Sequence, residues 1–180
     1  MTSNLPSSII QKEYDTEWEN RNKELYKEVV KEVKEESVFL KEGMNFESYA
    51  TEVLSSLDLI SESIKYPLMV YNLTKCLIRV SIDYLLRDYY FDKNYDFIAD
   101  KLFGVYCRKN KDYNNSAEKQ MMIDGILSFK TRLQDKISRI DSFNRSKELE
   151  VKDEKIVDTI MDLTNYCVIF CIWYKKGEIK

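Results

Sequence analysis

Apolar residues recur at helical spacing along most of the chain, and short polar stretches separate these segments. Over 16–41, Leu25, Val29, Val33 and Leu40 share one face among many Glu and Lys side chains, which indicates a charged amphipathic helix. The same pattern predicts helices over about 46–65, 68–90, 95–108, 116–143 and 153–174. No segment of the sequence shows the alternation of a strand. We therefore predict an all-α fold, a multi-helix bundle of about five to six helices in a single compact domain.

Three features locate helix ends and the core. Asn45 is a suitable N-cap for the helix over 46–65. Tyr66-Pro67 separates that helix from the next, because the residue before a proline avoids helical backbone angles. The segment 68–90 is so apolar that we expect it to form the central helix of the bundle and to be more buried than its neighbours. Between two helices, 108–116 reads RKNKDYNNS, which has the composition of a solvated loop.

The composition of the chain limits which binding partners and which cellular compartment we expect. Only 4 Gly and 2 Pro occur in 180 residues, which favours long helices joined by short turns. The net charge of −3 comes from 28 basic and 31 acidic residues that are mixed along the chain, so strong general nucleic-acid binding is not expected. The N-terminus has no signal-peptide pattern, and no stretch reaches the roughly 18 continuous apolar residues of a membrane span. We predict a cytoplasmic protein with no membrane association.

The chain contains no histidine, which excludes Ser-His-Asp triads, Cys-His dyads and histidine-ligated metals. Cys76, Cys107, Cys167 and Cys171 show no CxxC spacing, so we interpret them as core thiols. Any catalysis must therefore use carboxylates, Lys, Arg, Tyr or a hard metal ion.

The last predicted helix carries a polar stripe. At about 100° per residue, Glu154, Asp158, Asp162 and Asn165 fall within about 80° of one another. Clustered carboxylates either stay in water or are neutralised by a cation, and oxygen ligands of this kind suit Mg²⁺. The stripe is thus either a magnesium site or a solvated acidic start of a helix, which the helix dipole also favours.

A second stripe follows the predicted helix over 116–143. Within about 40° of Ser128 lie Asp124, Arg132, Asp135, Arg139 and Ser142, opposite an apolar face. Arg132, Asp135 and Arg139 have the spacing of salt bridges on a helix surface. Alternatively, the arginines bind phosphate oxygens bidentately. The pattern alone leaves both interpretations open.

Three motifs in order resemble a known family. YCRKNKDYNNS, SFKTRLQDKISRI and VKDEKIVDTIMDLTNYCVI resemble the first of the nucleotide-modification-associated domain families of phages and bacteria, over about 103–170. The family pattern is a K-N-x-D-Y-G-x-S loop, an R-x-x-D-K-x-x-R helix and an E-S-x-x-D-T-x-x-D-L-x-N-Y helix. Asn114 stands where the family has glycine, and Lys155 stands where it has serine. The matching positions are Lys109, Asn110, Asp112, Tyr113, Ser116, Arg132, Asp135, Lys136, Arg139, Glu154, Asp158, Asp162, Asn165 and Tyr166.

The resemblance implies a role with free or modified nucleotides. The acidic helices are also similar to those of the all-α MazG-type nucleotide pyrophosphatases, which hold Mg²⁺ with Glu and Asp. This chain lacks the E-E-x-x-E helix of those enzymes. We expect an N-terminal helical region of no known family over 1–100 and the nucleotide-modification-associated region over 101–176, packed as one domain.

Three functions follow as hypotheses. The first is a Mg²⁺-dependent nucleotide (pyro)phosphohydrolase of a phage or bacterial setting. The second is a binding protein that acts as a sponge or sensor of a signalling nucleotide, and the third is a helical protein-interaction module. The 13 Tyr and 8 Phe also offer material for a homo-oligomer interface.

In the first hypothesis each matched residue has a role. The metal ligands are Glu154, Asp158 and Asp162. The catalytic group is Asp112, Asp135 and Lys136, in which the two carboxylates complete the cation site or position water. The remaining residues bind substrate: Lys109, Asn110, Tyr113, Ser116, Arg132, Arg139, Asn165 and Tyr166.

Overall fold

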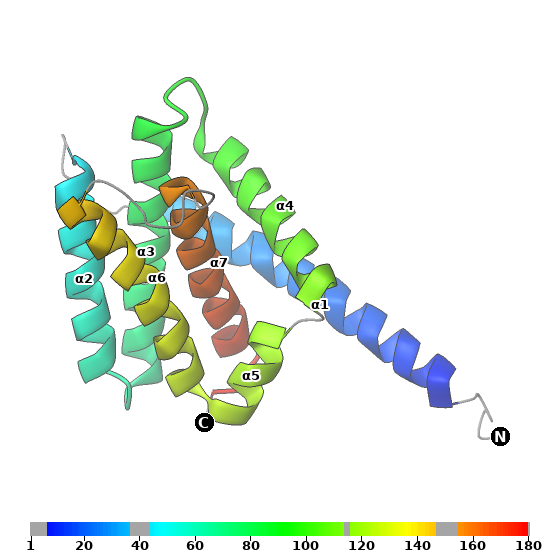
Figure 1. Cartoon of the computed structure of the whole chain (residues 1–180). Helices are drawn as coiled ribbons and strands as arrows, with labels where there is room; N and C mark the ends of the chain where they lie inside the picture. Colours follow the sequence, from blue (N-terminus) through cyan, green and yellow to red (C-terminus); the bar gives the residue numbers. More distant parts are fainter. Residues whose placement is uncertain (1–6, 37–43, 114–115, 147–154, 180) are drawn as a thin grey trace.

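The computed structural model describes residues 7–36, 44–113, 116–146 and 155–179, and these segments form an all-helical bundle (Figure 1). The helices are α1 (Ser7–Glu35), α2 (Phe46–Glu62), α3 (Pro67–Asp88), α4 (Tyr95–Tyr113), α5 (Ser116–Asp124), α6 (Ile126–Ser146) and α7 (Ile156–Lys175). The predicted all-α class is confirmed. The predicted number of five to six helices is too low, because the described segments contain seven.

The additional helix arises at Gly125. This glycine adopts φ of 65°, and its N–H donates to the Met121 carbonyl at 2.8 Å, which ends α5. A glycine in the left-handed region is a common helix terminator, because other residues pay a steric cost there. The helix predicted over 116–143 is therefore two helices, and Asp124 does not belong to the stripe of α6.

The start of α2 and of α3 agrees with the sequence signals. The Asn45 side chain accepts a hydrogen bond from the Ser48 N–H at 2.9 Å, so the predicted N-cap is present. Pro67 occupies the first turn of α3, where its missing N–H costs nothing.

α3 is more buried than its chain neighbours α2 and α4, as predicted, but the most buried of the described helices is α7, so the prediction that 68–90 forms the central helix is wrong. Fourteen of the 20 residues of α7 are buried, because it packs against α1, α3 and α6 and also touches α4 and α5. Figure 1 shows α7 in the middle of the bundle. In α3, 11 of 22 residues are buried, and its other face leaves Leu68, Met69 and Cys76 exposed.

Of the described helices, α7 alone has the length and mean hydropathy of a membrane span, but 78% of that window is buried inside the bundle. Its position in the core accounts for its apolar composition. Cys167 and Cys171 on this helix are buried free thiols, as predicted, whereas Cys76 is exposed and Cys107 is half-buried.

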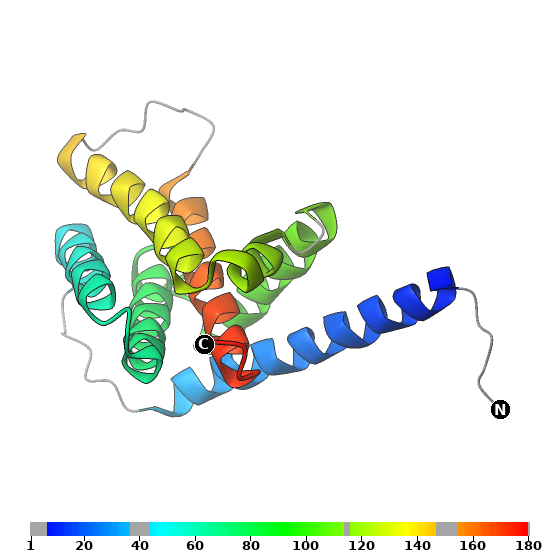
Figure 2. The same cartoon turned by 90° about the horizontal axis from the view of Figure 1, so that it is seen from below.

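The first helix joins the bundle through its C-terminal half. Tyr26, Val29, Val30 and Val33 are buried there, and α1 contacts α3, α4 and α7. The helix begins at Ser7 rather than at 16, and its N-terminal part extends away from the other helices (Figures 1 and 2). The predicted apolar position Leu40 lies outside the described residues.

A charged cluster, here called the Glu32 network, fastens α1 to α3 and α7. Glu32 accepts hydrogen bonds from Tyr71 at 2.9 Å and Lys75 at 3.0 Å, and it pairs with Lys175 at 2.8 Å. Burial opposes ionisation of Glu32, but the hydrogen bonds from Lys175, Lys75 and Tyr71 outweigh it and lower its pKa to about 2. Each donor stabilises the ionised carboxylate, so this cluster favours the folded state at neutral pH.

Candidate functional site

Most of the predicted loop over 108–116 is helical. α4 continues to Tyr113, so Lys109, Asn110 and Asp112 stand on its last turns. The segment contains neither proline nor glycine, and Asn and Asp weaken a helix without ending it. The Tyr113 side chain and residues 114–115 lie outside the described residues.

A pocket of about 290 Å³ lies where α4, α5, α6 and α7 meet. Eight of its eleven described lining residues belong to the set of sequence motifs. These eight are Lys109, Asn110, Ser116, Arg132, Lys136, Asp162, Asn165 and Tyr166, and the other three are Tyr106, Ala117 and Ile169. Residues that are up to 57 positions apart in the chain, from Lys109 to Tyr166, thus share one concave surface.

Asp162 is the acidic member of the pocket lining, and two lysines neutralise it. Its Oδ1 is 2.5 Å from Lys109 Nζ, and its Oδ2 is 3.4 Å from Lys136 Nζ. The side chains of Asp162 and Lys136 are only 13% and 11% exposed, whereas Lys109 is 47% exposed. The α7 stripe has no cation of its own, and the fold supplies two from α4 and α6.

The stripe predicted on α6 is divided between the pocket and the surface. Arg132 lines the pocket, and its guanidinium lies over the Tyr166 ring at 5.8 Å from the centroid. Asp135 is exposed and contacts Lys136 at 3.7 Å and Arg139 at 3.9 Å. Asp135 and Arg139 therefore form the helix-surface pair that the spacing also predicted, and neither lines the pocket.

The proposed metal ligands are not gathered by the described residues. Asp158 is exposed one turn before Asp162, Asp112 is exposed on α4, and Glu154 lies outside the described residues. Within the described ranges, no three Asp, Glu or Cys side chains form a group that could hold a metal ion. Asp162 shares its carboxylate with two ammonium groups, so the described residues do not complete a Mg²⁺ site by themselves.

Several residues that hydrogen bonds connect to the pocket lining are not predictable from the sequence pattern. Tyr106 donates to Glu118 Oε1 at 3.0 Å, and Asn22 of α1 donates to Glu118 Oε2 at 2.6 Å. Burial raises the pKa of Glu118, which is 5% exposed, above its ordinary value. Tyr26 of α1 donates to Asn165. Partners 96 and 139 positions apart leave no local pattern that could have predicted these contacts.

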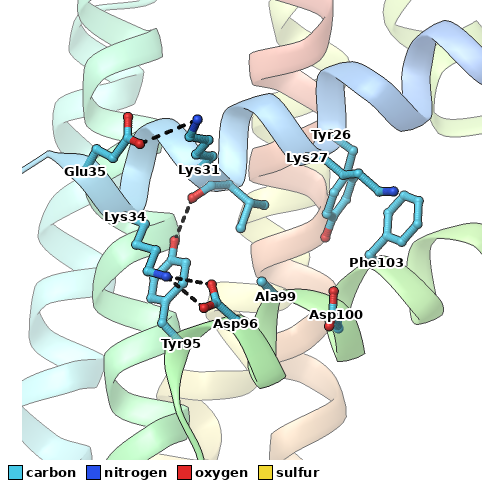
Figure 3. A pocket seen from close by; sticks show the side chains of 11 residues that line it. Tyr26, Lys27, Lys31, Lys34, Glu35, Tyr95, Asp96, Ala99, Asp100 and Phe103 are labelled. Carbon is cyan, nitrogen blue, oxygen red and sulfur yellow. Dashed lines mark hydrogen bonds and ion pairs between the residues drawn. The ribbon is translucent and has the colours of Figure 1, made fainter.

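A larger hollow of about 660 Å³ lies between α1 and α4 (Figure 3). None of the described motif residues lines it. Its described lining has three lysines and three carboxylates, among them Asp96, which Lys34 contacts at 2.7 Å. Among the described residues, the lining of the smaller pocket has three cations and one carboxylate. An excess of positive charge suits a phosphate group, so the smaller pocket is the candidate site.

Residues 109–173 match the family model of nucleotide modification associated domain 1. This match bears out the resemblance seen in the three motifs. The matched domain contains all eight motif residues that line the pocket, whereas Asn22, Tyr26 and Tyr106 lie before it. No curated protein and no solved structure matches the chain. A relation to MazG-type enzymes stays a prediction.

Proposed function

We propose that the chain binds a nucleotide in the pocket between α4, α5, α6 and α7. The observation that carries this proposal is the charge of the described pocket lining, in which Lys109, Lys136 and Arg132 stand against one carboxylate, Asp162, in a chain of net charge −3. Local positive charge on an acidic protein attracts a polyanion to that spot. The name of the matched domain supports a nucleotide as that polyanion.

The phosphates interact with the three cations. Arg132 offers a planar pair of donors that suits two phosphate oxygens, and the lysines act as point charges. Lys109 is the half-exposed partner of Asp162, so it can turn toward a ligand at little cost. Lys136 is nearly buried and holds its position.

The remaining lining suits the nucleoside part. Tyr166 offers an aromatic ring, and Asn110, Ser116 and Asn165 offer polar groups. Base stacking on an aromatic ring contributes about 1–3 kcal/mol. A volume of about 290 Å³ lies at the small end of ligand sites, which favours a single nucleotide over a dinucleotide.

A thermal-shift and calorimetry panel tests this proposal. The common ribonucleotides and deoxyribonucleotides, each as mono- and triphosphate, are added to the full chain in EDTA and again with Mg²⁺. We expect at least one to raise the melting temperature in EDTA, because binding to the folded state alone stabilises it. A double variant, Lys136→Met with Arg132→Met, should lose this shift. If no member of the panel binds the wild type, the nucleotide proposal is wrong and the helical interaction module is favoured.

Mg²⁺-dependent hydrolysis of a nucleotide is a second candidate. It is favoured by the position of Asp158 one helical turn before Asp162, with Asp162 in the pocket wall. The two carboxylates could contribute to a Mg²⁺ site if substrate phosphates supplied further oxygen ligands and drew Lys109 and Lys136 away from Asp162. Phosphorus NMR of the same nucleotides with Mg²⁺ should show a new product, and Asp158→Ala should abolish it. Full turnover by Asp158→Ala would refute this candidate without affecting the binding proposal.

A further inference from the structure

Tyr26 belongs to α1, outside the matched domain, yet it reaches the wall of the candidate site. Its side chain is 1% exposed, and its ring lies 4.8 Å from that of Tyr106 and 5.2 Å from that of Phe103. Figure 3 shows the tyrosine extending from α1 beside Phe103 of α4. Its hydroxyl donates to Asn165 Oδ1 at 2.5 Å, and Asn165 lines the pocket.

Two contacts together set the orientation of the Asn165 amide. The Leu102 carbonyl can only accept, so the amide nitrogen of Asn165 must face it, at 3.3 Å. The amide oxygen then faces Tyr26, whose hydroxyl is the donor. Burial raises the pKa of Tyr26 well above its ordinary value, so the phenol keeps the proton that it donates.

This orientation determines what Asn165 offers to a ligand. The amide oxygen is occupied by Tyr26, and one amide hydrogen is given to Leu102. Within the described part of the chain, Leu102 is the hydrogen-bond partner of that nitrogen, which leaves its second hydrogen for the pocket. Asn165 is 6% exposed, so a ligand rather than bulk water is the suitable acceptor.

We propose that Tyr26 is a positioning residue of the nucleotide pocket, which turns the Asn165 amide so that an N–H is presented to a hydrogen-bond acceptor of the ligand. This inference rests on the proposed function. It assigns a role to α1, and it requires a phosphate oxygen, a sugar oxygen or a base carbonyl at that point of the ligand. An exocyclic amino group there would meet a donor and be rejected.

Tyr26→Phe removes the hydroxyl and keeps the ring packing. Tyr95→Phe is a matched control, because Tyr95 is also a buried tyrosine between α4 and α1, and its hydroxyl donates to the Val30 carbonyl at 3.1 Å (Figure 3). Tyr95 does not line the candidate pocket. Both variants lose one buried tyrosine hydrogen bond between α1 and another part of the bundle, so a general loss of stability should affect them alike.

Two measurements test the orientation of Asn165 and the binding of the ligand separately. The side-chain amide signals of Asn165 in ¹⁵N NMR, assigned by their loss in Asn165→Asp, report the orientation without any ligand. Calorimetry with the nucleotide panel and with inorganic pyrophosphate reports binding. We expect Tyr26→Phe to shift the Asn165 signals and to weaken nucleotide binding about tenfold, as loss of one positioned hydrogen bond implies. Tyr95→Phe should do neither.

Each outcome decides something. Unchanged Asn165 signals in Tyr26→Phe overturn the positioning role, and so does equal weakening by Tyr95→Phe. Weakening of pyrophosphate and nucleotide alike supports the inference with a phosphate oxygen as acceptor, whereas weakening of the nucleotide alone supports it with a sugar or base oxygen. If the wild type binds no nucleotide, the proposed function fails and the ligand part of the inference fails with it, while the NMR signals still decide whether Tyr26 orients Asn165.

Discussion

Replacing Asp162 with asparagine tests whether the two lysines of the pocket are held for an anion. The change removes the charge and keeps the shape of the side chain. Among the described residues, Lys136, which is nearly buried, then keeps the exposed Asp135 as its carboxylate partner, at 3.7 Å. Breaking a fully buried ion pair costs about 3–5 kcal/mol. Because Asp135 remains and Lys109 can reach water, we expect about 1–2 kcal/mol.

For a chain of this size, that loss lowers the melting temperature by roughly 2–8 °C. Added pyrophosphate should then reverse the effect, because it supplies the charge that Asp162 no longer provides and meets no carboxylate among the described lining residues. Differential scanning fluorimetry in EDTA at low salt, with rising pyrophosphate, measures both effects. The stabilisation by pyrophosphate should be larger for Asp162→Asn than for the wild type, and it should shrink as salt screens the charges.

Asp158→Asn is the matched control, because Asp158 stands one turn earlier on α7 and is exposed. It should change neither the melting temperature nor the response to pyrophosphate in EDTA. The reasoning is refuted if Asp162→Asn unfolds at the wild-type temperature, or if pyrophosphate stabilises the wild type as strongly as the variant. Either result would mean that Asp162 does not compete with an anion for the lysines.

Three further predictions concern stability. The Glu32 network holds the pKa of Glu32 near 2, below its ordinary 4.5, so its contribution is complete above pH 4.5 and is lost as the pH falls toward 2. Glu32→Gln should therefore lower the unfolding free energy by about 1–2 kcal/mol at pH 7, allowing for partial solvent screening, and the difference in urea titrations should shrink between pH 4.5 and pH 2. The contribution of Glu118 to stability depends on pH in the opposite direction. Burial raises its pKa above 4.5, so its contribution is complete below pH 4.5 and is lost as the pH rises through the folded value. As the pH rises from 4.5 through the folded pKa of Glu118, the melting temperature of Glu118→Gln should consequently fall less than that of the wild type. Gly125→Ala meets no atom within 4 Å but keeps φ of 65°, so only backbone strain of about 1 kcal/mol should appear, as a melting point lower by roughly 2–4 °C.

The local features of the fold were predictable because they depend on neighbours in the chain. Apolar spacing identified helical segments, Asn45 marked a helix start and Pro67 marked the next. Two helix ends were predicted wrongly, and both errors concern local features. The residues RKNKDY looked like a loop, but their individual propensities are too weak to end α4, and Gly125 ended a helix that the apolar pattern continued.

The residues of the candidate site were predictable only in part. Eight motif residues line one pocket, and the motifs place them on neighbouring helices in order. The rotation of α6 was not available from the motifs, so Asp135 and Arg139 were chosen together with Arg132 and Lys136 although only the latter two line the pocket. Which face of a helix is covered depends on the helices around it, and the sequence of one helix does not contain that information.

The sequence by itself determined the helical class, most helix boundaries and the kinds of side chain available, namely carboxylates, lysines, arginines and tyrosines without a histidine. Only the tertiary structure decided that Lys109 and Lys136 neutralise Asp162, that α7 rather than α3 fills the core, and that Tyr26 donates a hydrogen bond to Asn165. The physical reason is the distance along the chain between the residues that interact. Helix formation follows from spacings of three and four residues, whereas ion pairs and buried hydrogen bonds join residues that only packing brings within about 3 Å.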